Sequence, residues 1–116
     1  MRILICGDRN WFKISYVREI LSWFDPKSDT IIHGAARGAD SMAGEVAEKL
    51  GYNLLVFPAD WEKHHRAAGP IRNRQMLEEG KPDIVFALHS NLAESKGTRN
   101  MVKISCKAGL PVLIYA

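Results

Sequence analysis

Five short, largely apolar segments recur along this chain, and segments with a helical pattern separate them. The apolar segments are residues 3–6, 30–33, 54–57, 84–88 and 112–115. Their apolar residues are continuous instead of alternating with polar ones, which is typical of strands covered on both faces, as in a parallel sheet. Because parallel neighbours must be joined by crossovers, usually helices, this pattern constrains the fold more than any other feature of the sequence.

Four segments with the period of an amphipathic helix lie between the predicted strands. The first has apolar residues at positions 17, 20, 21 and 24, and the second runs from residue 39 to 50 and is closed by Gly51. The third is expected to begin near Pro70, a residue suited to the first helical position, and to end at Gly80. The fourth is expected to run from about residue 98 to 108.

The strict alternation of strand and helix predicts an α/β fold, a Rossmann-like doubly wound five-stranded parallel sheet with helices on both faces. The expected strand order is 3-2-1-4-5, in which ligands bind at the switch point between the first and fourth strands. Residues 1–116 suit a single domain, without a repeat or a second domain. The connection over residues 58–69 is predicted to be an unusually long loop, and such loops are often functional.

The composition indicates an ordinary globular protein. The chain is 47% hydrophobic and 25% charged, and its net charge of +3 is too small to indicate nucleic acid by itself. No apolar stretch approaches the roughly 20 residues that span a bilayer, and no signal peptide is expected. Because of the lack of such a stretch, no membrane partner is expected. Cys6 and Cys106 are interpreted as reduced packing residues, which favours a cytoplasmic protein.

Positively charged side chains accompany the predicted start of every helix. They are Arg9, Arg37, Arg72, Arg74, Lys96 and Arg99. A helix N-terminus already carries partial positive charge and favours Asp or Glu. Cations gathered along one edge of a sheet are therefore unfavourable unless an anion binds among them, and phosphate is the obvious candidate.

Small residues follow the first and second predicted strands and precede the fourth helix. Gly7 and the Gly34–Gly38 region leave backbone N–H groups accessible, which is how a phosphate is cradled, although tight packing of a helix on a sheet also requires small residues. Asp40 is interpreted either as a partner of a ribose hydroxyl or as a stabiliser of the helix start. Thr98, after Gly97, is interpreted either as an anion donor or as a helix cap.

The segment after the third strand adds further candidates. Trp61 either stacks on a base or anchors the loop. Arg72 and Arg74 can each grip a phosphate with two parallel hydrogen bonds, or they form salt bridges with nearby carboxylates such as Asp8 and Asp60. The adjacent His64 and His65 have a poor spacing for metal binding, so no metal is expected. No cofactor is expected either.

Taken together, these motifs resemble the YspA/YpsA-related branch of the SLOG superfamily. Residues 7–9, 34–40, 58–61, 68–76 and 97–98 carry the resemblance in order, over nearly the whole chain. It implies a Rossmann-like fold that binds a nucleotide or nucleotide-derived small molecule, such as an ADP-ribose-like molecule or a nucleoside monophosphate, as a sensor or binding module. The candidate ligand-binding residues are Gly7, Asp8, Arg9, Gly34, Arg37, Gly38, Asp40, Asp60, Trp61, Arg72, Arg74, Gly97 and Thr98.

The superfamily includes the Lonely guy phosphoribohydrolases, which cleave the base from a nucleoside monophosphate. Arg72 and Met76 match that family's Arg four positions before a Met, and Gly97-Thr98 match part of its Pro-Gly-Gly-x-Gly-Thr-x-x-Glu motif. Met101 stands where the functional Glu is expected, and Met cannot transfer a proton. The resemblance therefore leaves enzymatic activity open, with a nucleoside-monophosphate glycosidase as the less favoured alternative, for which Asp8, Asp40 or Asp60 would have to replace the Glu.

The superfamily also includes the DNA-processing protein A family, which binds single-stranded DNA. Such binding would use an extended basic groove with several aromatic side chains, and only Trp11 and Trp61 are candidates here. Binding of nucleic acid is therefore the least favoured of the three functions considered, after the binding module and the glycosidase. Relatives of the family often dimerise, so a homodimer is considered beside a monomer.

Overall fold

The computed structural model describes residues 1–116 and confirms the Rossmann-like parallel sheet. The strands are β1 (Arg2–Gly7), β2 (Thr30–His33), β3 (Asn53–Val56), β4 (Ile84–Leu88) and β5 (Val112–Tyr115). All neighbouring pairs are parallel, and the strand order is β3-β2-β1-β4-β5, as the sequence predicts. The switch point therefore lies between β1 and β4.

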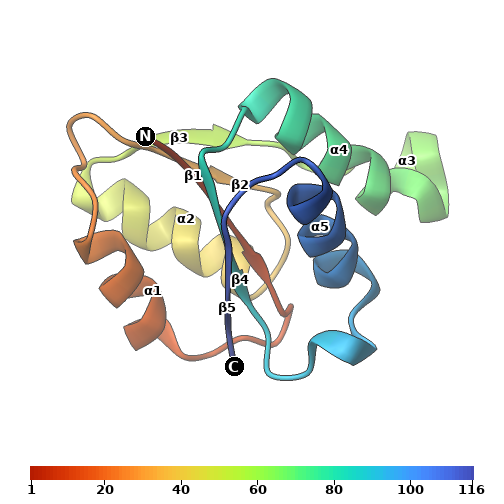
Figure 1. Cartoon of the computed structure of the whole chain (residues 1–116), viewed down its shortest axis with the longest axis horizontal. Helices are drawn as coiled ribbons and strands as arrows, with labels where there is room; N and C mark the ends of the chain where they lie inside the picture. Colours follow the sequence, from red (N-terminus) through yellow and green to blue (C-terminus); the bar gives the residue numbers. More distant parts are fainter.

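Helices cover both faces of this sheet (Figure 1). They are α1 (Ile14–Ser22), α2 (Ala39–Leu50), α3 (Trp61–His64), α4 (Ala68–Gly80) and α5 (Lys96–Lys107), with 3₁₀ turns η1 (His65–Ala67) and η2 (Leu92–Glu94). One core cluster joins one face of the sheet to α1 and α2, and the other joins the opposite face to α4 and α5. None of the helices is long and apolar enough to span a membrane.

The burial of the central strand β1 on both faces explains why its sequence is continuously apolar. Ile3 and Ile5 pack in the cluster with α1 and α2, whereas Leu4 and Cys6 pack in the cluster with α4 and α5. All four side chains are at most 6% exposed. A strand buried on both faces needs apolar residues at every position, because successive side chains point to opposite faces.

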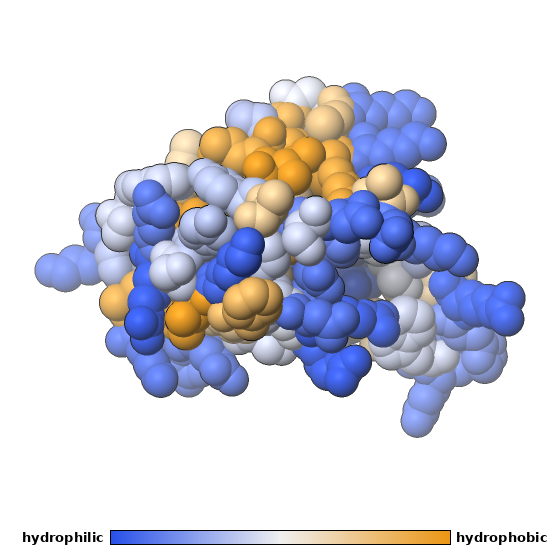
Figure 2. Space-filling view, turned by 90° about the horizontal axis from the view of Figure 1, so that it is seen from below, coloured by the Kyte–Doolittle hydropathy of each residue, from blue (hydrophilic) through white to orange (hydrophobic).

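The two edge strands are less covered than the sequence predicts. Val56 of β3 is 46% exposed, and Leu113 and Ile114 of β5 are 38% and 50% exposed. Figure 2 shows apolar surface gathered on the β5 side of the molecule. The expectation that all five strands are covered on both faces is wrong for these two. An edge strand has a neighbour on one side only, and the helices lie mainly over the inner strands.

The segment predicted as a long loop is largely helical. Residues 61–67 form α3 and η1, and α4 begins at Ala68, two residues before the predicted start at Pro70. Asp60 starts α3 by accepting a hydrogen bond from the backbone N–H of Lys63 at 3.1 Å. Pro70 lies inside the first turn of α4, where its missing N–H leaves no hydrogen bond unmade.

Two smaller expectations also differ from the structure. Helix α5 begins at Lys96 instead of Thr98, because Ser95 caps it. Cys6 is buried, as expected of a packing residue, but Cys106 is exposed, so the interpretation of both cysteines as packing residues is wrong for Cys106.

Candidate functional site

A cavity of about 820 Å³ opens at the carboxyl ends of β1 and β4. Its walls come from the end of β1 and the residues after it, from the start of α2, from α4, from His89 after β4 and from the first turn of α5. A smaller cavity of about 510 Å³ lies beside it, next to the turn between β2 and α2. The two cavities share the wall residues Arg9, Ala36, Trp61 and Arg72.

Gly38 lets two of these walls come into contact. Its φ of 76° is in the left-handed region, and a Cβ at this position would collide with the carbonyl of Asp8 and with the backbone of Arg9. The backbone N–H of Ala39, the next residue, donates to the Asp8 carbonyl at 3.0 Å. The glycine therefore fixes the turn before α2 against the segment that follows β1.

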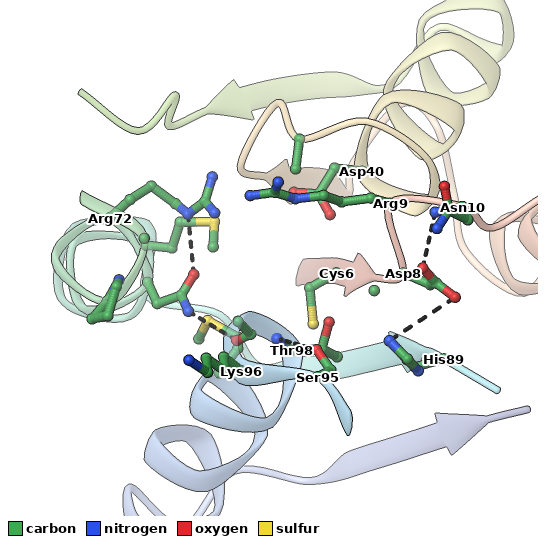
Figure 3. A pocket seen from close by; sticks show the side chains of 18 of the residues that line it. Cys6, Asp8, Arg9, Asn10, Asp40, Arg72, His89, Ser95, Lys96 and Thr98 are labelled. Carbon is green, nitrogen blue, oxygen red and sulfur yellow. Dashed lines mark hydrogen bonds and ion pairs between the residues drawn. The ribbon is translucent and has the colours of Figure 1, made fainter. Parts of the chain in front are cut away.

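Arg72 projects from α4 into the space where the two cavities meet. One terminal nitrogen donates to the carbonyl of Gly34, and Nε donates to Asn73 Oδ1 at 3.0 Å (Figure 3). A Cβ on Gly34 would collide with the guanidinium, so the glycine makes room for it. Burial lowers the pKa of Arg72, the nearby charge of Asp40 raises it, and Arg9 has a smaller lowering effect. Arg72 forms no salt bridge, which removes the alternative interpretation of this residue as an ion-pair partner.

Asn73 links Arg72 to the first turn of α5. It is 3% exposed, and its Nδ2 donates to the Gly97 carbonyl at 3.2 Å and to Asn100 Oδ1 at 3.0 Å. The sequence analysis did not select Asn73. A signal was present, because Asn is a weak helix former and this one lies in the middle of a helix.

The first turn of α5 forms one wall of the larger cavity. Ser95 Oγ accepts a hydrogen bond from the Thr98 backbone N–H at 3.1 Å, so Ser95 and not Thr98 is the cap. The Thr98 side chain is 6% exposed, and its hydroxyl makes no hydrogen bond within the protein. Together with Lys96 and Gly97 it lines the cavity, so its hydroxyl is available to a bound molecule.

Asp40 stabilises the turn between β2 and α2. Its carboxylate is 3% exposed and accepts a hydrogen bond from the Gly34 backbone N–H at 2.8 Å. Burial raises the pKa of Asp40 to about 6, although the Gly34 N–H and the charge of Arg72 act in the opposite direction. Asp40 also lines the larger cavity, so the structural role found for it leaves an interaction with a ligand open.

Asp8 and His89 face each other at the switch point. Asp8 Oδ2 lies 3.9 Å from His89 Nε2, and Asp8 Oδ1 accepts the backbone N–H of Asn10 at 2.9 Å (Figure 3). His89 Nδ1 accepts the backbone N–H of Asn91 at 2.9 Å, so the proton of the neutral imidazole is on Nε2, toward Asp8. His89 was not among the residues selected from the sequence, although a polar residue directly after a buried strand is a signal.

Arg9 and Trp61 lie together at the boundary of the two cavities. The Arg9 guanidinium lies 5.8 Å from the centre of the Trp61 ring, a cation–π contact. Figure 3 shows the Arg9 side chain reaching across the cavity toward Arg72. Trp61 is 49% exposed, so it remains accessible to a ligand as well as to Arg9.

Three of the predicted site residues line neither cavity. Gly38 shapes the turn, Asp60 caps α3, and Arg74 is exposed on α4. Gly7, Asp8, Asp40, Gly97 and Thr98 line the larger cavity only, and Gly34 and Arg37 the smaller one only. Arg9, Trp61 and Arg72 line both.

The cations around the cavities are not neutralised within the protein. The chain contains one ion pair, Met1 with Asp29, and one contact of a histidine with a carboxylate, His89 with Asp8, and no Arg or Lys side chain takes part in either. No group of three or more His, Cys, Asp or Glu side chains is placed to hold a metal ion. The site therefore combines unpaired positive charge with open volume.

Comparison with known proteins relates this site to one family. The model of the YspA, cpYpsA-related SLOG family matches residues 1–64, which include β1, the turn before α2 and α3. The chain is also similar to the Gene 61 protein of Mycobacterium phage D29, with 36% identity over 98% of this chain and 95% of that protein.

Proposed function

The chain belongs to the YspA, cpYpsA-related SLOG family, and on that premise we propose that it binds a phosphorylated, nucleotide-derived small molecule as a sensor or binding module. The observation that carries the proposal is the partly buried guanidinium of Arg72, which points into the cavity and forms no salt bridge, although the charge of Asp40 acts on it from a greater distance. A buried charge without a partner is costly, and a bound phosphate would supply that partner.

A phosphate would find its other partners at the start of α5. The Thr98 hydroxyl faces the cavity without a hydrogen-bond partner, and the Lys96 side chain lies beside it. The first N–H groups of a helix have no partner within the helix, and the helix dipole adds partial positive charge there. Charge-assisted hydrogen bonds from Lys and Arg to phosphate are among the strongest polar contacts in proteins.

The remainder of the larger cavity suits a nucleoside. Ligand pockets for small molecules have volumes of about 300–1,000 Å³, and this one is about 820 Å³. The carboxylates of Asp8 and Asp40 are acceptors for sugar hydroxyls, and the exposed ring of Trp61 offers a surface on which a base can stack.

The experiment that tests the proposal compares Arg72→Ala with Arg74→Ala. A thermal-shift screen of nucleoside monophosphates, ADP-ribose and cyclic dinucleotides identifies a ligand, and calorimetric titration then gives its affinity. Arg72→Ala is expected to weaken binding by about 2 kcal/mol or more, because a charge-assisted contact is lost. Arg74→Ala removes the same charge from an exposed position on the same helix, so its affinity is expected to stay within about 0.5 kcal/mol of the original. Equal affinities of the two variants would remove Arg72 from the site.

A second candidate function is hydrolysis of a nucleoside monophosphate to free base and ribose phosphate. Met101, where the hydrolases have Glu, lies in the cavity wall at 1% exposure and cannot act as an acid or base. The observation that favours hydrolysis is Asp8, a carboxylate in the same cavity beside His89. Chromatography of the ligand after incubation separates the two functions. Release of free base that is lost in Asp8→Asn would favour the hydrolase, and recovery of intact ligand would favour the sensor.

Single-stranded DNA is the least supported ligand. Trp11, one of the two aromatic candidates, is 6% exposed and packs against Tyr16 with ring centres 5.9 Å apart. The expectation that it could stack on a base is therefore wrong, and Trp61 alone remains.

A further inference from the structure

We propose that the smaller cavity is a second anion subsite, and that the ligand is a nucleotide carrying phosphates at two separate positions of its ribose. The inference rests on the proposed function and extends it, because it specifies the chemistry of the ligand's second end. It follows from the charges of the smaller cavity, from the hydrogen-bonding groups in its walls and from the position of its boundary with the larger cavity.

The smaller cavity has positively charged side chains and no negatively charged one. Arg9, Arg37 and Arg72 are among its nine lining residues, which include no Asp and no Glu. None of the three arginines is in an ion pair elsewhere in the chain. Like charges around one cavity repel one another in the absence of an anion, and Arg9 lowers the pKa of Arg72, although burial and the opposing charge of Asp40 in the larger cavity have larger effects on it. An anion bound between them would remove this repulsion.

The other walls of the smaller cavity offer little to a sugar or a base. They consist of Gly34, Ala35, Ala36, Pro58, Ala59 and the ring of Trp61, so no side chain there accepts a hydrogen bond. The larger cavity is different, because Asp8, Asn10, Asp40 and Ser95 provide acceptors for hydroxyl and amino groups. The nucleoside is therefore assigned to the larger cavity, and a group that only accepts hydrogen bonds, such as phosphate, to the smaller one.

The boundary between the cavities separates the two phosphates. Lys96 and Thr98 line only the larger cavity and Arg37 lines only the smaller one. Arg72 lies on the shared wall, as do Arg9 and Trp61, which contact each other. One phosphate at the start of α5 and another at Arg37 would thus have the nucleoside between them. A nucleoside 3′,5′-bisphosphate has this arrangement, and so does the 5′-phosphorylated end of a single strand.

Two isomers test the inference directly. ADP and adenosine 3′,5′-bisphosphate contain the same atoms and differ only in where the second phosphate is attached. Calorimetric titration of the complete chain with AMP, ADP and the bisphosphate is expected to give a dissociation constant for the bisphosphate that is at least about tenfold lower than for ADP. The same set with guanine in place of adenine covers the other purine base.

Arg37→Ala identifies the subsite. In this variant the ratio of the ADP to the bisphosphate dissociation constant is expected to fall from about ten or more to about three or less. Arg74→Ala removes the same charge at an exposed position outside both cavities, and the ratio is expected to be retained there. Circular dichroism of both variants shows whether the fold is kept. A ratio that survives Arg37→Ala overturns the assignment of the subsite.

The outcomes separate this inference from the proposed function. If AMP, ADP and the bisphosphates fail to bind and the thermal-shift screen also gives no ligand, the proposed function itself fails. If AMP binds but ADP or ADP-ribose binds as tightly as the bisphosphate, only the second anion subsite is overturned. If a 5′-phosphorylated trinucleotide binds more tightly than the bisphosphate and loses this advantage in Arg37→Ala, the anion subsite is retained, but the assignment of the ligand as a small-molecule nucleotide is overturned.

Discussion

Arg72 shows how one side chain depends on residues that are distant in the sequence. Gly34 supplies the space and a carbonyl acceptor for its guanidinium, and Asn73 holds Nε and links it to Gly97 in α5. No carboxylate forms a salt bridge with the guanidinium. The side chain is therefore fixed in position while its charge stays available, which is the arrangement that a preorganised phosphate site requires.

Asp40 is expected to make the free energy of unfolding fall as the pH rises, whereas a carboxylate in an ion pair makes it rise. Its pKa is raised from 3.8 to about 6 by burial, so the folded state favours the neutral form. The contribution of Asp40 to stability is fully present below pH 3.8 and is lost as the pH rises through about 6. The loss is on the order of 3 kcal/mol.

The comparison of the original chain with Asp40→Asn tests this expectation. Asn keeps an acceptor for the Gly34 N–H and does not titrate. Urea unfolding at pH values from 4 to 7 is expected to show the free energy of unfolding of the original chain falling relative to that of the variant. Parallel curves for the two proteins would show that Asp40 is ionised in the folded state throughout this range.

The turn between β2 and α2 is the element that places the glycine-rich segment against the end of β1. A matched pair of substitutions measures how much of its conformation depends on that contact. Gly38 and Gly51 both have positive φ values, 76° and 88°, but only Gly38 has other backbone atoms where a Cβ would lie. Gly51→Ala is expected to cost about 1 kcal/mol for the left-handed conformation alone.

Gly38→Ala is expected to cost about 3 kcal/mol, because the Cβ also displaces the backbone of Asp8 and Arg9. Chemical denaturation of both variants measures the difference. Gly38→Ala should weaken nucleotide binding as well, since Asp8 and Arg9 line the cavity. Equal destabilisation by the two substitutions would mean that the segment after β1 moves away at little cost.

At the scale of the whole molecule, the sheet has two open edges. The β5 edge has an exposed apolar side chain, Ile114, on a strand whose outer backbone groups are not paired within the sheet. Such edges favour association with another chain, and an edge lysine opposes it. Ile114→Lys is therefore expected to slow aggregation on heating, while the free energy of unfolding changes by about 1 kcal/mol or less.

Ile71→Lys is the control for the edge prediction. Ile71 is 43% exposed, close to the 50% of Ile114, but it lies on α4, whose backbone is bonded within the helix. Light scattering during heating and size-exclusion chromatography at several concentrations measure association. If Ile71→Lys has the same effect as Ile114→Lys, exposed hydrophobicity and not the strand edge causes association. Chromatography also tests whether the chain forms a homodimer.

The sequence by itself determined the sheet. Continuous apolar segments and helical periods are local patterns, and parallel strands with right-handed crossovers leave few alternatives, so the order β3-β2-β1-β4-β5 could be predicted. The helical turns of residues 61–67 were missed because a four-residue helix and a 3₁₀ turn have no period long enough to detect. The same patterns did not distinguish edge from central strands, since burial at an edge depends on how far the helices extend.

Only the tertiary structure decided which charged and polar residues share a cavity. Arg72 and Arg74 are equivalent in sequence, but they differ by two positions, about 200° around a helix, so one reaches the cavity and the other is exposed. His89 and Asn73 carry weak signals in the sequence, but their contacts with Asp8 and Arg72 are what identify them as site residues. A local pattern fixes the period of an element, whereas the neighbours of a side chain depend on how distant elements pack.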